Sequence, residues 1–145
     1  MPDQDKPSTL PTSEPSLRAI AMPADTNPSG DIFGGWLISQ MDLAGSTVAT
    51  RQASGRVATV AITSMVFRQP VFVGDEVTCY AQISKVGHTS IAVTIESWVR
   101  RGIGHNAIKV TEGLFTYVAI GEDRRPRLIA KDPDAGEQTA GGTPS

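Results

Sequence analysis

The segment NPSGDIFGGWLISQMD, residues 27–42, contains residue types that could do chemistry. Gly34 and Gly35 stand where a helix is expected to begin, and the first N–H groups of a helix are unpaired and carry partial positive charge. Because glycine has no Cβ, a ligand oxygen can come close to this backbone. The pair therefore predicts a site for a phosphate or a developing oxyanion. A steric alternative stays open, in which the glycines let the helix pack closely on a sheet or on a neighbouring chain.

Asp42 follows about two turns later on the same predicted helix, among apolar neighbours. No Lys or Arg stands three or four positions away, so no partner on the helix neutralises its charge. A carboxylate at the edge of an apolar face, without a local partner, is a candidate general base or nucleophile. Two alternatives stay open: an exposed aspartate on the helix surface, or one paired with an arginine such as Arg56 or Arg68.

The spacing restricts how these groups can cooperate. Gly35 and Asp42 are seven residues apart, which is about 10 Å along a helix. A base must lie within hydrogen-bond reach of the water that it activates, so Asp42 cannot easily serve a carbonyl held at its own helix N-terminus. It could serve one held by a second copy of the chain. This leads to the hypothesis of a twofold dimer with two interface sites, which an active monomer would contradict.

Asn27 precedes the predicted helix in the segment DTNPSGD. Next to Pro28 it is first of all a turn residue, and its amide could also orient a water or a substrate carbonyl near the helix start. Serine nucleophiles are weaker candidates, because Ser39 and Ser46 have no histidine at a suggestive spacing and no Gly-x-Ser-x-Gly segment occurs. His88 is expected in a solvated turn.

One long helix and several strands must position these residues. Steps of three and four between apolar or small residues predict a helix from about Gly34 to Ala53, with Gly55 as its left-handed cap. A short strand, LRAIAM, precedes it. Four β-rich runs follow, separated by turn-forming segments that predict hairpin-like connections: VATVAITSMVF, EVTCYAQISKV, TSIAVTIESWVRR and AIKVTEGLFTYVAI. This order predicts an α+β domain with a single helix lying across a strongly curved antiparallel sheet.

Composition limits the functional classes. With 13 basic and 15 acidic residues, a formal charge of −2, the chain lacks the basic stripe that nucleic acid requires. The single Cys79 cannot form an internal disulfide, which fits a reducing compartment, and one Cys with two His argues against a zinc site. No apolar run approaches ~20 residues and no signal peptide is recognisable, so we expect no membrane span and a cytoplasmic location. Residues 1–16 and 131–145 are predicted to be disordered tails around one folded domain, 17–130.

Three motifs occur together: Pro-x-Asp-Thr-Asn at residues 23–27, Gly-Asp-Ile-Phe-Gly-Gly at 30–35 and Gln-Met-Asp at 40–42. With GRVATVAITSMVFRQPVFVGDEV and ISKVGHTSIAVTIESWV, they closely resemble the hot-dog-fold acyl-CoA thioesterases of the YciA type, over about residues 20–120. The resemblance implies a long helix wrapped by a curved antiparallel sheet, and dimers that often assemble into hexamers as trimers of dimers. It also implies hydrolysis of acyl-CoA to CoA and a carboxylic acid, with no metal or redox cofactor.

The resemblance also implies roles for residues. Asp42 is similar to the catalytic carboxylate of the family, acting as base or nucleophile, and Asn27 to the polar residue that assists from the other subunit. The backbone of Gly34 and Gly35 is similar to the donor that polarises the thioester carbonyl. The residues implied to lie near the substrate or the CoA arm are Ser64, Gly87, His88, Thr89 and Ser90, with Arg68 and Lys85 near its phosphates.

Two rival functions from other classes stay open. A dehydratase with this fold would need a histidine near the helix, and neither His88 nor His105 lies near it in sequence. A non-catalytic acyl-CoA sensor would have no need of Asp42 and Asn27, and no DNA-binding segment is recognisable. Stoichiometric binding of acyl-CoA without thiol release would favour the sensor.

Overall fold

The protein is described by a computed structural model covering residues 9–104 and 106–130. Its elements are β1 (Leu17–Ile20), the 3₁₀ turn η2 (Pro23–Asp25), α1 (Gly34–Ala53), β2 (Val57–Phe67), β3 (Glu76–Val86), β4 (Ser90–Arg100) and β5 (Ile108–Ala119). The helix and the strands lie where the sequence predicts them, within two residues at each end. Residues 1–8 of the predicted N-terminal tail, the predicted tail 131–145 and His105 lie outside the described residues.

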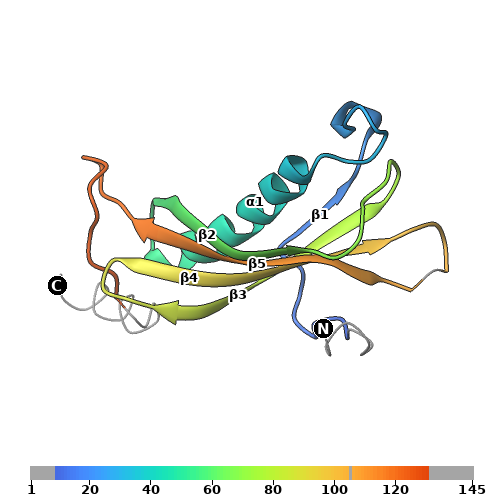
Figure 1. The fold of residues 1–145 in the computed structure, drawn as a ribbon. Coiled ribbons are helices and arrows are strands. Elements are labelled where there is room, and N and C mark those ends of the chain that lie inside the picture. Colours follow the sequence, from blue (N-terminus) through green and yellow to red (C-terminus); the bar gives the residue numbers. More distant parts are fainter. Residues whose placement is uncertain (1–8, 105, 131–145) are drawn as a thin grey trace.

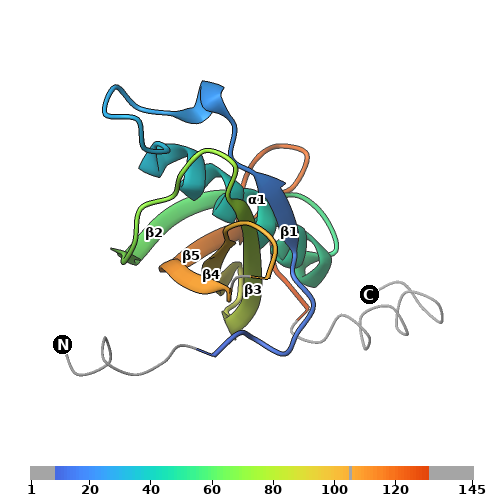
Figure 2. The ribbon, with the colours of Figure 1, turned by 90° about the vertical axis from the view of Figure 1, so that its right-hand side faces the viewer.

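All five strands form one antiparallel sheet in the order β1-β3-β4-β5-β2. The sheet curves around α1, which lies against its concave face (Figures 1 and 2). The prediction of a single helix across a curved antiparallel sheet is therefore confirmed. Among the helices of the described residues, none is long and apolar enough to cross a membrane.

One predicted connection is wrong. A hairpin from β2 to β3 was expected, but β2 is an edge strand that pairs with β5, whereas β3 pairs with β1 and β4. Residues 68–75 instead cross over the end of the sheet near the start of α1, where the backbone N–H of Ile32 donates to the carbonyl of Val71 at 2.9 Å. The buried carboxylate of Asp75 accepts hydrogen bonds from the backbone of Phe72 and from Arg101, which holds this crossover in place. Turn-forming composition alone cannot distinguish a crossover from a hairpin.

The helix packs on the sheet through small and medium side chains. Its buried positions are Leu37, Met41, Ala44, Gly45, Ala49 and Ala53, which recur at steps of three and four. They meet the buried residues of the inner sheet face, including Val93, Ile95, Phe115 and Tyr117. The cap differs from the prediction: Ser54, with φ 54°, takes the left-handed position in place of Gly55, and its N–H bonds to the carbonyls of Thr50 and Arg51.

Candidate active site

The N-terminus of α1 presents free backbone donors. The N-cap residue Phe33 makes no side-chain capping bond, and within the described residues the N–H groups of Gly34 and Gly35 have no partner. A Cβ added at Gly35 would meet nothing within 4 Å, and one at Gly34 would make ordinary contact with the Phe67 ring at 3.4 Å. Packing within this chain therefore does not require glycine at position 35, and the backbone there stays open to an approaching oxygen.

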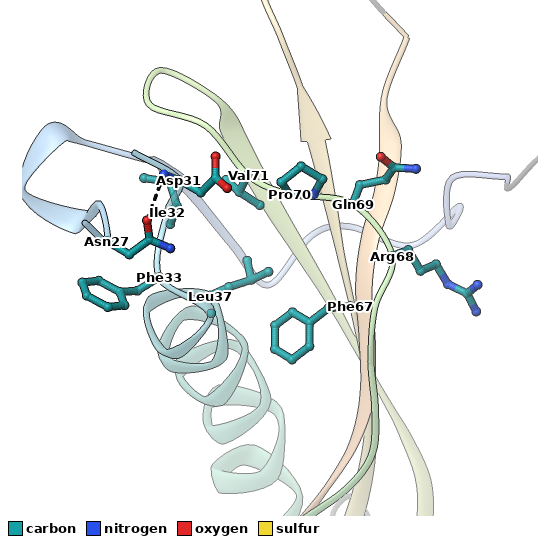
Figure 3. A pocket seen from close by; sticks show the side chains of 11 residues that line it. Asn27, Asp31, Ile32, Phe33, Leu37, Phe67, Arg68, Gln69, Pro70 and Val71 are labelled. Atoms are coloured by element: carbon teal, nitrogen blue, oxygen red, sulfur yellow. Dashed lines mark hydrogen bonds between the residues drawn. The ribbon is translucent and has the colours of Figure 1, made fainter. Parts of the chain in front are cut away.

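A pocket of about 330 Å³ opens beside this helix start (Figure 3). It lies between the segment that leads into the start of α1 and the crossover from β2 to β3, so two stretches of chain, residues 27–37 and 67–71, build it. Its walls are mainly apolar, with the polar side chains of Asn27 and Asp31 on one side. It is lined by Asn27, Asp31, Ile32, Phe33, Gly34, Leu37, Phe67, Arg68, Gln69, Pro70 and Val71.

The side-chain amide of Asn27 uses its oxygen to stabilise a turn and leaves its nitrogen available for a ligand. Its Oδ1 accepts hydrogen bonds from the backbone N–H groups of Ser29 at 2.9 Å and Asp31 at 3.1 Å, so the side chain closes the turn before the helix. These bonds fix which end of the amide faces the turn (Figure 3). The Nδ2 hydrogens have no protein acceptor within the described residues and are free to bind an acceptor in the pocket.

Asp42 lies further along α1, outside that pocket, and is half-buried. Two side chains donate to its Oδ1: the hydroxyl of Thr59 on β2 at 2.7 Å and the hydroxyl of Tyr117 on β5 at 3.1 Å. Burial, followed by the charge of Asp42, raises the pKa of Tyr117 far above its usual range. The open alternative of pairing with Arg56 or Arg68 is not realised within the described residues, where the carboxylate is held by hydroxyl donors.

Arg68 reaches the opposite face of the sheet. Its backbone borders the pocket, but its guanidinium points away from α1 (Figure 3) and pairs with Glu112. Lys109 also contacts this carboxylate, at 3.0 Å. The hydrogen bond from Arg68, assisted by Lys109, lowers the pKa of Glu112. A role of Arg68 at a CoA phosphate stays a prediction, and it would require the guanidinium to leave this ion pair.

The remaining residues named from the sequence lie elsewhere in the chain. Ser64 is exposed at an irregularity of edge strand β2 and has the left-handed φ of 54°. Lys85 is the last residue but one of β3, and the turn Gly87–Ser90 connects β3 to β4 at the end of the sheet where α1 finishes. There the carbonyl of Thr89 accepts from Ala119 and that of His88 from Ile129. Their binding roles stay predictions.

Along α1, one chain holds three groups of candidate residues apart from one another. Asn27, Gly34 and Gly35 surround the start of α1, Asp42 lies in its middle, and the turn from Gly87 to Ser90 lies near its end. A helix of 20 residues is about 30 Å long, so a single chain does not bring the first and last groups together. Thr59 and Tyr117 were not predicted as site residues, because no spacing signal in the sequence links either one to Asp42.

The chain is similar to known thioesterases in sequence and in structure. The family described as the Thioesterase superfamily matches residues 29–103. The chain is 53% identical to the acyl-CoA thioester hydrolase YciA of Salmonella typhimurium, over 82% of this chain and 92% of that protein. A hexameric thioesterase from Yersinia pestis superposes with a TM-score of 0.80 at 50% identity, covering 85% of this chain and 100% of that one. A hexameric hotdog-fold thioesterase of Campylobacter jejuni gives 0.80 at 41% identity, with 85% and 95% covered.

Proposed function

The chain belongs to the Thioesterase superfamily and has the hot-dog fold, and we propose that it hydrolyses the thioester bond of acyl-CoA to give free CoA and a carboxylic acid. The observation that carries the proposal is the open start of α1, where the unpaired N–H groups of Gly34 and Gly35 lie beside the amide of Asn27. Such donors stabilise the negative charge that develops on a carbonyl oxygen under attack. Relatives that are 53% and 48% identical to this chain are named acyl-CoA thioester hydrolases.

In the proposed reaction the thioester oxygen lies at the start of α1, where the backbone donors and Asn27 Nδ2 polarise the carbonyl. The carboxylate of Asp42 either removes a proton from the attacking water or attacks the carbonyl itself to form an anhydride that water then hydrolyses. In either route the C–S bond breaks and CoA leaves as a thiolate. Because this leaving group is stable, the proposed reaction needs no metal or redox cofactor.

The proposal requires two chains for one site, because Gly35 and Asp42 are about 10 Å apart along the helix. Edge strand β2 supports such an assembly. Within the described residues its backbone pairs with a strand on one side only, and Val60 and Ile62 are 57% and 40% exposed. Exposed apolar edge strands commonly pair with a second copy. Antiparallel pairing of two β2 strands reverses one chain relative to the other, so the middle of one α1 can approach the start of the other. We further propose that such dimers assemble into hexamers, because the similar thioesterases from Yersinia pestis and Campylobacter jejuni are hexameric.

The substrate is then acyl-CoA, and the residues proposed to contact it are Ser64, Arg68, Lys85 and the turn Gly87–Ser90 of either chain. We also propose a cytoplasmic location.

The sole cysteine, Cys79, is free and fully buried, and burial raises the pKa of its thiol to about 11. This thiol therefore reacts slowly with the reagents used to detect released CoA.

The decisive test is thiol release from short, medium and long acyl-CoAs by the wild type and by Asp42→Asn. We expect turnover by the wild type and a loss of about a hundredfold or more in the variant, because a positioned general base contributes 10²–10⁴-fold. Asp123→Asn, in the turn after β5, is the matched control and should be as active as the wild type. Both variants must form the same oligomer as the wild type for the comparison to hold.

Two outcomes would contradict the proposal. Equal activity in Asp42→Asn would remove Asp42 from the mechanism. Stoichiometric binding of acyl-CoA by the wild type without thiol release would favour the sensor.

A further inference from the structure

We propose that Tyr117 is a positioning residue, which holds Asp42 by one carboxylate oxygen so that the other faces the reacting group. The inference rests on the thioesterase function proposed above. Tyr117 lies in β5, 75 positions from Asp42 in sequence, and its side chain is 0% exposed. Its hydroxyl lies 3.1 Å from Oδ1 of Asp42 and 3.1 Å from the backbone oxygen of the same residue. One buried hydroxyl thus contacts both the side chain and the backbone of the candidate catalytic residue.

A second donor shares the same carboxylate oxygen. Thr59 Oγ1, on β2, lies 2.7 Å from Asp42 Oδ1. Within the part of the chain that the structure describes, Oδ2 has no hydrogen-bond partner. Because two donors from two different strands bind Oδ1, they restrict rotation of the carboxylate about the Cβ–Cγ bond of Asp42. Oδ2 is then the oxygen available to accept a proton from water or to attack the thioester carbon.

The chemistry of Tyr117 fits a donor and not a base. Burial removes its hydroxyl from water, and the nearby charge of Asp42 adds to the effect, so the pKa of Tyr117 is far above its usual range. The phenol is therefore held in its protonated form beside the carboxylate, and it acts as the hydrogen-bond donor. A hydrogen bond to an ionised acceptor is stronger than one between neutral groups.

The backbone of α1 makes room for this contact. A Cβ added at Gly45, three residues after Asp42, would lie 2.2 Å from Tyr117 Oη and 2.5 Å from Ile95 Cδ1. Any side chain at position 45 would therefore displace the hydroxyl. Glycine lowers the stability of a helix interior by about 1 kcal/mol relative to alanine. At position 45 this loss allows the hydroxyl of Tyr117 to reach Asp42.

Tyr117→Phe tests the role, because it keeps the ring and removes only the hydroxyl. Tyr80→Phe is the matched control, since Tyr80 lies on β3 and lines a different groove, with Arg18 and Trp98. In Tyr117→Phe we expect kcat to fall about tenfold with KM within about twofold, as for loss of an interaction made to the transition state. The acid limb of the kcat–pH profile should move about half a unit to higher pH, because an anion-stabilising donor is lost. Tyr80→Phe should match the wild type in all three quantities.

The Asp42→Ala background shows whether Tyr117 acts through Asp42. There the added Tyr117→Phe change should alter the residual kcat by less than about twofold, because residues that act as a unit are not additive. A tenfold loss in that background would overturn the inference. So would an unchanged kcat and pH profile in Tyr117→Phe alone, even if the wild type is an active thioesterase. If the wild type hydrolyses no acyl-CoA, the proposed function fails and this role fails with it.

A spectroscopic measurement covers the case in which Tyr117→Phe does not fold. The chain has two tyrosines, so Tyr80→Phe protein labelled with 3-fluorotyrosine carries its only fluorine at Tyr117. We expect its ¹⁹F signal to shift when Asp42→Asn is added, because the phenol then donates to a neutral amide. An unchanged signal would overturn the inference.

Discussion

A Cβ built on Gly45 would lie 2.2 Å from the phenolic oxygen of Tyr117, so the helix and the strand fit together only because position 45 has no side chain. Gly45→Ala must therefore displace Tyr117 or lift α1 from the sheet. Overpacking of this kind lowers the free energy of unfolding by about 1–3 kcal/mol. The higher helix propensity of alanine, worth about 1 kcal/mol, does not offset this loss. We expect urea denaturation to show a lower free energy of unfolding and thiol-release assays to show a lower kcat. Unchanged stability would mean that the helix does not lie this close to Tyr117.

The same substitution at the start of the helix should have the opposite effect on stability. A Cβ at Gly35 meets nothing within 4 Å, and alanine is the better helix former by up to about 1 kcal/mol. Gly35→Ala should therefore fold at least as stably as the wild type. It should still lose kcat/KM, because its methyl group lies where the thioester oxygen must approach the backbone donors. Stability and kcat/KM measured on the same preparation separate the two effects, and full activity would exclude this helix start as the oxyanion site.

Asn27 can be tested without disturbing its turn. Asn27→Asp retains an oxygen that can accept from the N–H groups of Ser29 and Asp31, but it loses the Nδ2 donor and adds a negative charge. We expect a melting temperature close to that of the wild type and a loss in kcat of about 10²-fold, the size typical of removing one oxyanion donor. A variant with both normal melting and normal kcat would restrict Asn27 to the turn.

Edge strand β2 offers a test of the dimer. Val60 is 57% exposed in the single chain, so Val60→Lys should not disturb the fold of one protomer. In a dimer paired through β2 it would bury an unpaired charge, which costs about 3–5 kcal/mol. Sedimentation velocity should show dissociation, and thiol release should fall with it. Ile103→Lys is the control, because Ile103 is fully exposed in the connection between β4 and β5. A Val60→Lys protein that keeps the wild-type assembly would place the interface elsewhere.

The ion pair of Arg68 and Glu112 predicts a pH-dependent contribution to stability. Hydrogen bonding to Arg68 lowers the pKa of Glu112 from its ordinary value of 4.5. A carboxylate with a lowered pKa stabilises the fold above its unfolded pKa, and this contribution is lost as the pH falls through the folded value. Glu112→Gln should therefore cost about 1 kcal/mol at pH 7, and the deficit should disappear well below pH 4.5. Urea titrations at neutral and acid pH measure it, with the exposed Glu122→Gln as control; a pH-independent deficit would contradict the argument.

Much of this protein could be predicted from the sequence because the signals are local. The step of three and four from Ile38 onward, and the β-rich runs after Val57, depend on neighbouring residues in the chain, and the helix and strands formed where these patterns stand. The proposed oxyanion site could likewise be named from the sequence, because Gly34, Gly35 and Asn27 lie within one short segment. The distance between Gly35 and Asp42 follows from the rise of the helix alone. Because this distance exceeds hydrogen-bond reach, it predicted that a second chain completes the site.

Only the tertiary structure decided which distant residues meet. The order of the strands places β2 beside β5, and this brings Thr59 and Tyr117 to one oxygen of Asp42 across separations of 17 and 75 residues. It also directs Arg68 to Glu112 on the far face of the sheet. Such contacts depend on sheet order and register, which are set by packing of the whole core and not by the local period of side chains. The sequence by itself determined the elements and the segment that begins the helix; the tertiary structure decided what holds Asp42 in place.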